Sequence, residues 1–291
     1  MKTLLSAIST LIFINCFSQQ DLIFPIVDAS HFEWKNIEKK PAASEVDKFI
    51  KSTPKEFQVY KQKDPTITSW NLDSLRKDLH FLDLNGDGKN DIVFEGQSGG
   101  EGREIIIFIN MGTSYRKVFS AFQEVVKMEW HDNRLTRLFI YDWGCCAEYL
   151  TRYMTYDVNY SQTNMPTFKK VFQGLFFNEG IKPDNLLEKP FRFKVLIEGY
   201  KIRIAPIIDD TSYQIWTEDS TKDALLGTTI GRLTKGATGT AIAKKQDNTG
   251  RVWLFVQIDE LYLPKNNIFY LENKFPTKLL GWISSRFIKT L

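Results

Sequence analysis

Short apolar and β-branched runs dominate the chain after residue 75, and several of them alternate with polar positions. Such runs are typical of β-strands, and the Gly- and Asn-rich stretches between them are typical of turns. Closely spaced short strands favour antiparallel pairing, so we predict a mainly β fold. The expected strands are Leu79–Leu84, Asp91–Glu95, Glu104–Asn110, Leu135–Tyr141 and Tyr149–Val158.

One segment before these strands has helical periodicity. Val46, Phe49 and Ile50 fall on one face of a helix over residues 44–51. Ser44 is suited to cap this helix at its N-terminus, and Pro54 ends it because proline disfavours a helical residue before it. We therefore expect one short helix within the β domain.

The first eighteen residues resemble an export signal. Lys2 supplies a positive charge, Leu4–Ile14 is a short apolar run, and small residues follow at positions 16 and 18. We predict a signal peptide over 1–18 and a secreted or periplasmic protein. A lipid anchor at Cys16 is the alternative. No later run is apolar enough for a transmembrane segment.

Composition narrows the possible functions. The chain has 291 residues, 43% of them hydrophobic, which suffices for a folded core, and its net charge is +3 without long basic runs. This charge pattern gives no reason to expect a nucleic-acid partner. Length and a Lys-Pro-Asp-Asn linker near residue 183 predict two domains, a β-rich domain over 19–185 and a second over 190–291.

The segment 83–91 has the pattern D-x-N-x-D-G-x-x-D. Alternate oxygen-bearing side chains in a tight loop are the ligands that Ca²⁺ prefers, and Gly86 and Gly88 permit the positive φ angles of such a wrap. An EF-hand is excluded because its twelfth position, which should be Glu, is Phe94. A plain acidic turn is the alternative. The expected ligands are Asp83, Asn85, Asp87, the backbone carbonyl of Lys89, and Asp91.

This loop, with strand-like flanks, resembles the calcium turn of FG-GAP/VCBS-type repeats over about residues 80–96. The resemblance implies a calcium ion held between two neighbouring strands. That family repeats its loop around a propeller, whereas this chain has it once. We therefore expect calcium to stabilise the β domain rather than to take part in catalysis.

Residues 193–291 resemble a bacterial SH3 domain in an ordered series of short motifs. These are YKIRIAP from residue 200, LG…IGRL…KG from residue 226, WLFV from residue 253, and GWISSRFI from residue 281. The resemblance implies a small β-barrel that docks a cell-wall peptide, a glycan or a protein ligand. The segments 213–223 and 259–278 are long for such a domain, and long loops carry binding specificity.

The aromatic residues of this part have two expected roles. Trp253 and Trp282 fall on the matched strands and are expected to pack in the core. The ligand-binding candidates lie in the long loops instead, and they are Tyr213, Trp216, Tyr262 and Tyr270.

After signal removal the only cysteines are the adjacent Cys145 and Cys146. A vicinal disulfide is short and strained, but export makes it credible. Two unlinked thiols and an intermolecular bond are the alternatives. A thiol assay on the denatured protein, with and without reductant, separates the disulfides from free thiols.

The sequence does not support catalysis. The histidines are scattered, and neither an H-E-x-x-H pair nor a G-x-S-x-G elbow is present. His131 falls in a predicted hairpin turn, and His80 is expected to be a half-buried sheet residue. We therefore expect a non-enzymatic protein. A cell-wall hydrolase or peptidase using Cys145 and His131, with the SH3-like domain as targeting module, is the alternative.

Overall fold

The computed structural model describes residues 26, 32–52, 57, 72–97, 102–143, 150–214, 225–259 and 276–291. Within them the protein is mainly β, with few helices, as the sequence predicts. The helical elements are η1 (Trp34–Asn36), α1 (Ala43–Ser52), α2 (Leu72–Lys77) and η4 (Ser285–Phe287). The strands are β1 (Leu79–Leu82), β2 (Asp91–Gln97), β3 (Arg103–Asn110), β4 (Tyr115–Phe122), β5 (Glu124–His131), β6 (Arg134–Asp142), β7 (Leu150–Tyr160), β8 (Pro166–Phe177), β9 (Phe191–Val195), β10 (Tyr200–Arg203), β11 (Tyr213–Gln214), β12 (Leu225–Leu226), β13 (Thr229–Leu233), β14 (Thr238–Gln246), β15 (Val252–Ile258), β16 (Lys278–Ser284) and β17 (Ile288–Thr290).

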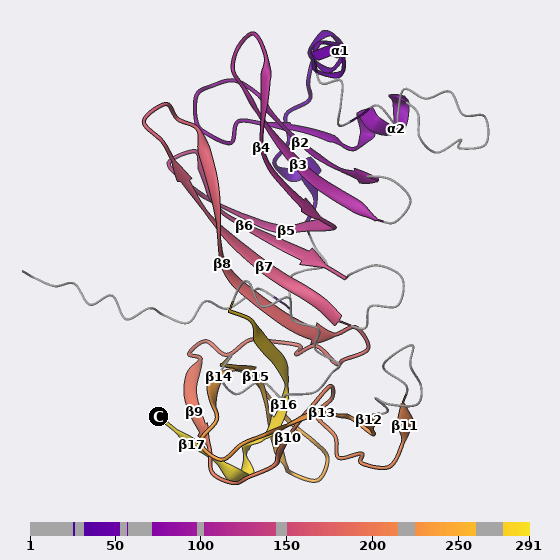
Figure 1. The fold of residues 1–291 in the computed structure, drawn as a ribbon, viewed down its shortest axis with the longest axis vertical. Helices are drawn as coiled ribbons and strands as arrows, with labels where there is room; N and C mark the ends of the chain where they lie inside the picture. Colours follow the sequence, from indigo (N-terminus) through magenta and orange to yellow (C-terminus); the bar gives the residue numbers. More distant parts are fainter. Residues whose placement is uncertain are drawn as a thin grey trace, which may run out of the picture.

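The first sheet is an antiparallel meander of β1 to β4 at one end of the molecule, beside α1 and α2 (Figure 1). Both of its faces are covered. Phe94 and Phe108 pack with helix residues such as Phe49 on one face. On the other face Val93 and Ile107 pack against residues of β5 to β7. Because β2 and β3 are buried on both sides, their sequences are apolar runs rather than alternating patterns.

The second sheet has eleven strands. Its strand order is β17-β9-β14-β15-β16-β8-β7-β6-β5, with β10 and β13 attached through β16. The long strands β5 to β8 are antiparallel, and β8 joins β16 by a short parallel pairing of Gly174 with Lys278 and Leu175 with Leu279. The sheet therefore continues across the predicted domain boundary at 185–190.

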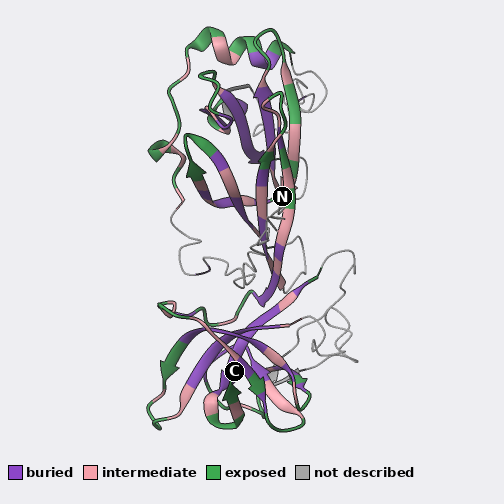
Figure 2. Cartoon of the chain, turned by 90° about the vertical axis from the view of Figure 1, so that its left-hand side faces the viewer, coloured by how far each residue is buried: buried purple, intermediate pink, exposed green. Residues whose placement is uncertain are grey.

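The C-terminal strands surround two apolar clusters. One lies between β9, β10, β13 and β15 and includes Phe193, Ile202 and Val256. The other joins Trp253 and Trp282 to Tyr153 and Phe176 of β7 and β8. Figure 2 shows the buried residues concentrated along these strands. Among the described strands of this part, pairing does not close into a ring, because β13 pairs only with β10.

Most sequence predictions of local structure are confirmed. Each of the five expected strands forms, and the turn at Asp132 and Asn133 is a hairpin with both φ angles positive, at 49° and 60°. The predicted helix forms as α1, but Ser44 lies within its first turn rather than before it. Strand β4 was not predicted, because its half-exposed positions carry many polar residues and lack a strong apolar signal. Strands β5 and β8 were not predicted either, although each contains an apolar stretch, at 125–126 in β5 and at 172–177 in β8.

No helix in the described part of the chain is both long and apolar enough to cross a membrane.

Candidate metal centre

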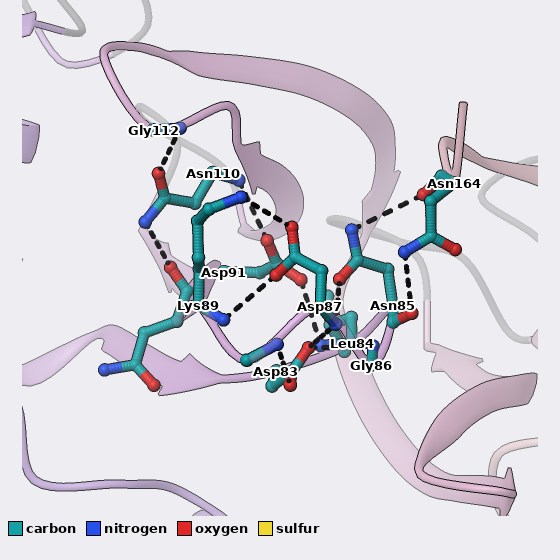
Figure 3. A network of polar contacts seen from close by, with 12 residues as sticks. Asp83, Leu84, Asn85, Gly86, Asp87, Lys89, Asp91, Asn110, Gly112 and Asn164 are labelled. Carbon is teal, nitrogen blue, oxygen red and sulfur yellow. Dashed lines mark hydrogen bonds and ion pairs between the residues drawn. The ribbon is translucent and has the colours of Figure 1, made fainter.

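The predicted calcium loop connects β1 to β2 at the edge where both sheets meet. Gly86 and Gly88 have φ angles of +72° and +83°, the left-handed conformation that the sequence pattern requires of them. The loop folds back on itself, so that its polar side chains lie close together (Figure 3). The predicted wrap is therefore present in the backbone.

Asp83 organises the first half of the loop. The backbone N–H groups of Gly86 and Asp87 donate to its Oδ1 at 2.8 and 3.1 Å, and the N–H of Gly88 donates to its Oδ2 at 2.8 Å. The amide oxygen of Asn85 accepts a further bond from the N–H of Asp87 at 3.1 Å. These bonds hold the backbone in a curve with several oxygens on its inner side.

Asp91 is the buried member of the loop, with 0% of its surface exposed. Its Oδ2 accepts from the N–H of Leu84 at 2.9 Å, and its Oδ1 accepts from the N–H of Asn110 at 2.8 Å. Burial raises the pKa of Asp91 to about 7; the two amide bonds oppose this rise, and the charges of Asp87 and Asp83 add to it. Asp91 is thus a buried carboxyl whose charged form needs further stabilisation.

Asp87 already has a cationic partner. The Lys89 ammonium lies 3.0 Å from its Oδ2, and the Lys89 backbone N–H donates to its Oδ1 at 2.9 Å (Figure 3). Burial raises the pKa of Asp87, but these bonds and the lysine charge outweigh burial and lower it. The Lys89 ammonium thus places a positive charge beside the loop carboxylates, as a bound cation would.

The oxygen atoms of the loop are the type of ligand that a hard cation prefers, but their side chains do not converge on one centre. An oxygen of this kind accepts two hydrogen bonds, and Asp83 Oδ2, Asn85 Oδ1, Asp87 Oδ1 and both Asp91 oxygens accept one each. Over the described ranges, however, no three or more His, Cys, Asp or Glu side chains gather as a metal-holding group. Asp83 and Asp91 accept hydrogen bonds from backbone amides, whereas Asp87 is paired with the Lys89 ammonium. A cation bound in the loop would therefore require the Asp87 carboxylate to turn away from that ammonium.

The loop also joins the two sheets. The Leu84 carbonyl accepts from the N–H of Leu135 at 2.9 Å and from the Tyr160 hydroxyl at 2.7 Å. Asn164, in the turn between β7 and β8, donates through its amide to the Asn85 carbonyl at 3.0 Å. Any ligand that stiffens this loop therefore stabilises the contact between the sheets.

A second polar cluster, which the sequence did not reveal, surrounds Glu95 on β2. Glu95 is 4% exposed and accepts a hydrogen bond from the Trp34 indole. That indole stacks on His80 at 4.1 Å, and His80 Nδ1 lies 2.8 Å from a Glu38 oxygen. A lone Glu in the apolar strand DIVFEGQ was the only sequence signal, and its partners come from a distant segment.

Glu95 is expected to make stability depend on pH. Burial raises its pKa to about 7 from an ordinary 4.5, against the opposing effects of Trp34 and Arg103. Between these values the folded protein holds a proton that the unfolded chain has released, so the free energy of unfolding falls as pH rises through this window and levels off above it. Chemical denaturation in EDTA from pH 4 to 8 should show this fall, a few kcal/mol at most. Glu95→Gln should make the fall less steep, while the contribution of Asp91, whose pKa is also raised to about 7, remains. Parallel profiles for the two proteins would contradict it.

None of the remaining predicted site residues whose side chains the structure describes joins this centre. Trp253 and Trp282 are core residues, each 1% exposed, as expected. His131 is the exposed last residue of β5, and its Nε2 lies 3.2 Å from Asp132 of the hairpin turn. The signal segment with Cys16, the cysteines 145 and 146, and Trp216, Tyr262 and Tyr270 lie outside the described residues. Tyr213 is described only as backbone, in β11 paired with β12.

The chain matches no protein-family model, no curated protein and no solved structure.

Proposed function

We propose that this is an exported, non-enzymatic protein in which Ca²⁺ bound by the 83–91 loop stabilises a β scaffold for ligand binding. The observation that carries the metal proposal is Asp91, a fully buried carboxyl held by two backbone amides, next to the charges of Asp83 and Asp87. A divalent cation would let these carboxylates ionise together. Asp83, Asn85, Asp87, Asp91 and the Lys89 carbonyl would hold it.

Support for a structural rather than a catalytic role comes from the place of the loop. Its backbone carries the bonds that join the two sheets, at Leu84 and Asn85. Because the loop lies at this joint, cation binding would resist separation of the sheets. The ion would supply charge compensation and stiffness, and the chain's own oxygens would orient the loop.

The ligand-binding part of the proposal rests on the C-terminal strands. Support comes from the packing of β9, β10 and β13 to β17 around apolar clusters, one of which contains Trp253 and Trp282. We propose that this unit docks a peptide or cell-wall ligand.

Calcium should raise the melting temperature of the EDTA-treated protein. A ligand at a hundredfold excess over its dissociation constant adds about 2.7 kcal/mol to stability, roughly 5–10 °C for a protein of this size. Asp87→Ala should abolish the response. Lys89→Met should strengthen it, because the variant keeps the backbone carbonyl and removes the competing ammonium. Differential scanning fluorimetry with a calcium titration measures all three.

The matched control is Asp184→Ala, which removes an equal charge from a side chain that is 74% exposed and distant from the loop in sequence. It should keep the full calcium response. A wild-type protein that is indifferent to calcium and EDTA would refute the metal proposal, and so would an Asp87→Ala variant that responds as the wild type does.

A further inference from the structure

A cavity of about 250 Å³ opens at the C-terminal part of the molecule. Its walls come from β10 and Ile208 beyond it, from the start of β15, and from the end of β16 with the segment after it, which are far apart in sequence. Four of its lining residues are cationic, namely Lys201, Arg203, Arg251 and Arg286, and its lining includes no Asp or Glu. No local sequence pattern predicts this cluster, because each cation lies in a different local context.

Two of these cations serve the fold. Arg203 is buried, donates to the Asp209 carbonyl at 3.0 Å, and pairs with Asp210 at 2.8 Å. The Lys201 ammonium lies 2.6 Å from the other Asp210 oxygen. Asp210 therefore offsets part of the positive charge on this wall of the cavity.

The other two cations have no such partner. Across the described ranges, neither the Arg251 nor the Arg286 guanidinium forms a hydrogen bond or an ion pair. Each lies beside an aromatic ring instead, Arg251 at 5.8 Å from the Trp253 ring centre and Arg286 at 5.5 Å from that of Phe287. Their N–H donors remain available to an anion.

Aromatic side chains form the apolar part of the cavity and are held in place. The Tyr200 hydroxyl donates to the Ser284 carbonyl at 2.6 Å, and its ring meets Phe287 edge to face at 6.0 Å. The Trp253 indole donates to Asp247 at 2.9 Å. Phe287 is 38% exposed, so a ligand can reach its ring. The walls are thus preorganised, which lowers the entropic cost of binding.

We propose that this cavity binds a peptide carboxylate with an apolar side chain next to it. A guanidinium matches the planar geometry of a carboxylate, and Tyr200 and Phe287 offer contact to an apolar group. The volume is small for a ligand site, which suits one or two residues rather than a long polymer. This inference deepens the docking role proposed above for the C-terminal unit, and it needs no calcium.

Isothermal titration calorimetry on the full mature chain tests the ligand class with three probes. N-acetyl-Leu-Phe carries a free terminal carboxylate, its C-terminal amide carries none, and N-acetyl-Glu-Phe-amide carries a side-chain carboxylate. We expect at least one acid to bind tenfold or more tightly than the uncharged amide. The acid that binds more tightly shows whether the carboxylate that the cavity prefers belongs to a chain terminus or to an acidic side chain.

Arg251→Gln and Arg286→Gln should each weaken binding of that acid about tenfold or more. The matched control is Arg116→Gln, an exposed arginine on β4 at the other end of the molecule, which should bind as the wild type does. Unchanged melting temperatures show that the variants fold.

Three results would overturn the proposal: equal affinity for acid and amide, undiminished affinity in both cavity variants, or binding of inorganic phosphate or a mononucleotide while no peptide binds. The titration is repeated in EDTA. If peptide binding is retained but calcium has no effect on stability, only the metal proposal is refuted. If calcium stabilises the protein but no peptide binds, only the peptide-binding proposal is refuted.

Discussion

Replacing Asp91 with alanine is expected to lower the free energy of unfolding by about 2–6 kcal/mol even in EDTA. The carboxyl is fully buried and accepts from the Leu84 and Asn110 amides. Alanine leaves both donors unsatisfied, at a cost of about 1–3 kcal/mol each. Asp91→Asn should lose less, because its carbonyl can still accept one of these bonds. Chemical denaturation in EDTA measures the effect apart from any metal.

Asp184→Ala is the control for this prediction. It removes a carboxylate from a side chain that is 74% exposed, at a position where φ is not positive. Its effect should stay within about 0.5 kcal/mol of wild type, as for surface substitutions in general. A loss at Asp91 no larger than this would show that the two amides find other partners, and that the loop does not depend on the buried carboxyl.

Trp282→Ala should cost about 3–5 kcal/mol, since its side chain is 1% exposed and packs in a full core. The indole also donates to the Ile181 carbonyl at 2.6 Å. Trp282→Phe keeps most of the apolar contact, including that with Phe255 at 5.2 Å, and should lose clearly less. For a chain of this length the alanine variant should melt roughly 10 °C lower.

Calorimetry of the same variant also tests the two-domain prediction. The cluster that contains Trp282 includes Tyr153, Phe172 and Phe176 of the preceding strands, and β8 pairs directly with β16. We therefore expect a single transition that shifts as a whole. Two transitions, with only one displaced by the substitution, would show that residues 190–291 unfold as an independent domain.

The sequence was informative where structure follows from neighbouring residues. The apolar run of β3, the helical face of α1 and the Gly-bearing loop at 83–91 all carry local signals that a backbone must satisfy. The turn at Asp132 and Asn133 is of the same kind, since both residues tolerate positive φ. Strand β4 carries no such signal, because its half-exposed positions are largely polar.

Contacts between distant segments could not be predicted from such local sequence signals. The pairing of β8 with β16, the burial of Glu95 beneath Trp34, and the meeting of Arg251 with Arg286 each join residues without a shared local pattern. A pairing partner is selected by the packing of the whole chain, and one sequence does not encode it as a period or a motif. The residues of the loop were thus evident from the chain alone, whereas its role at the joint of two sheets and the position of the cationic cavity were determined by tertiary packing.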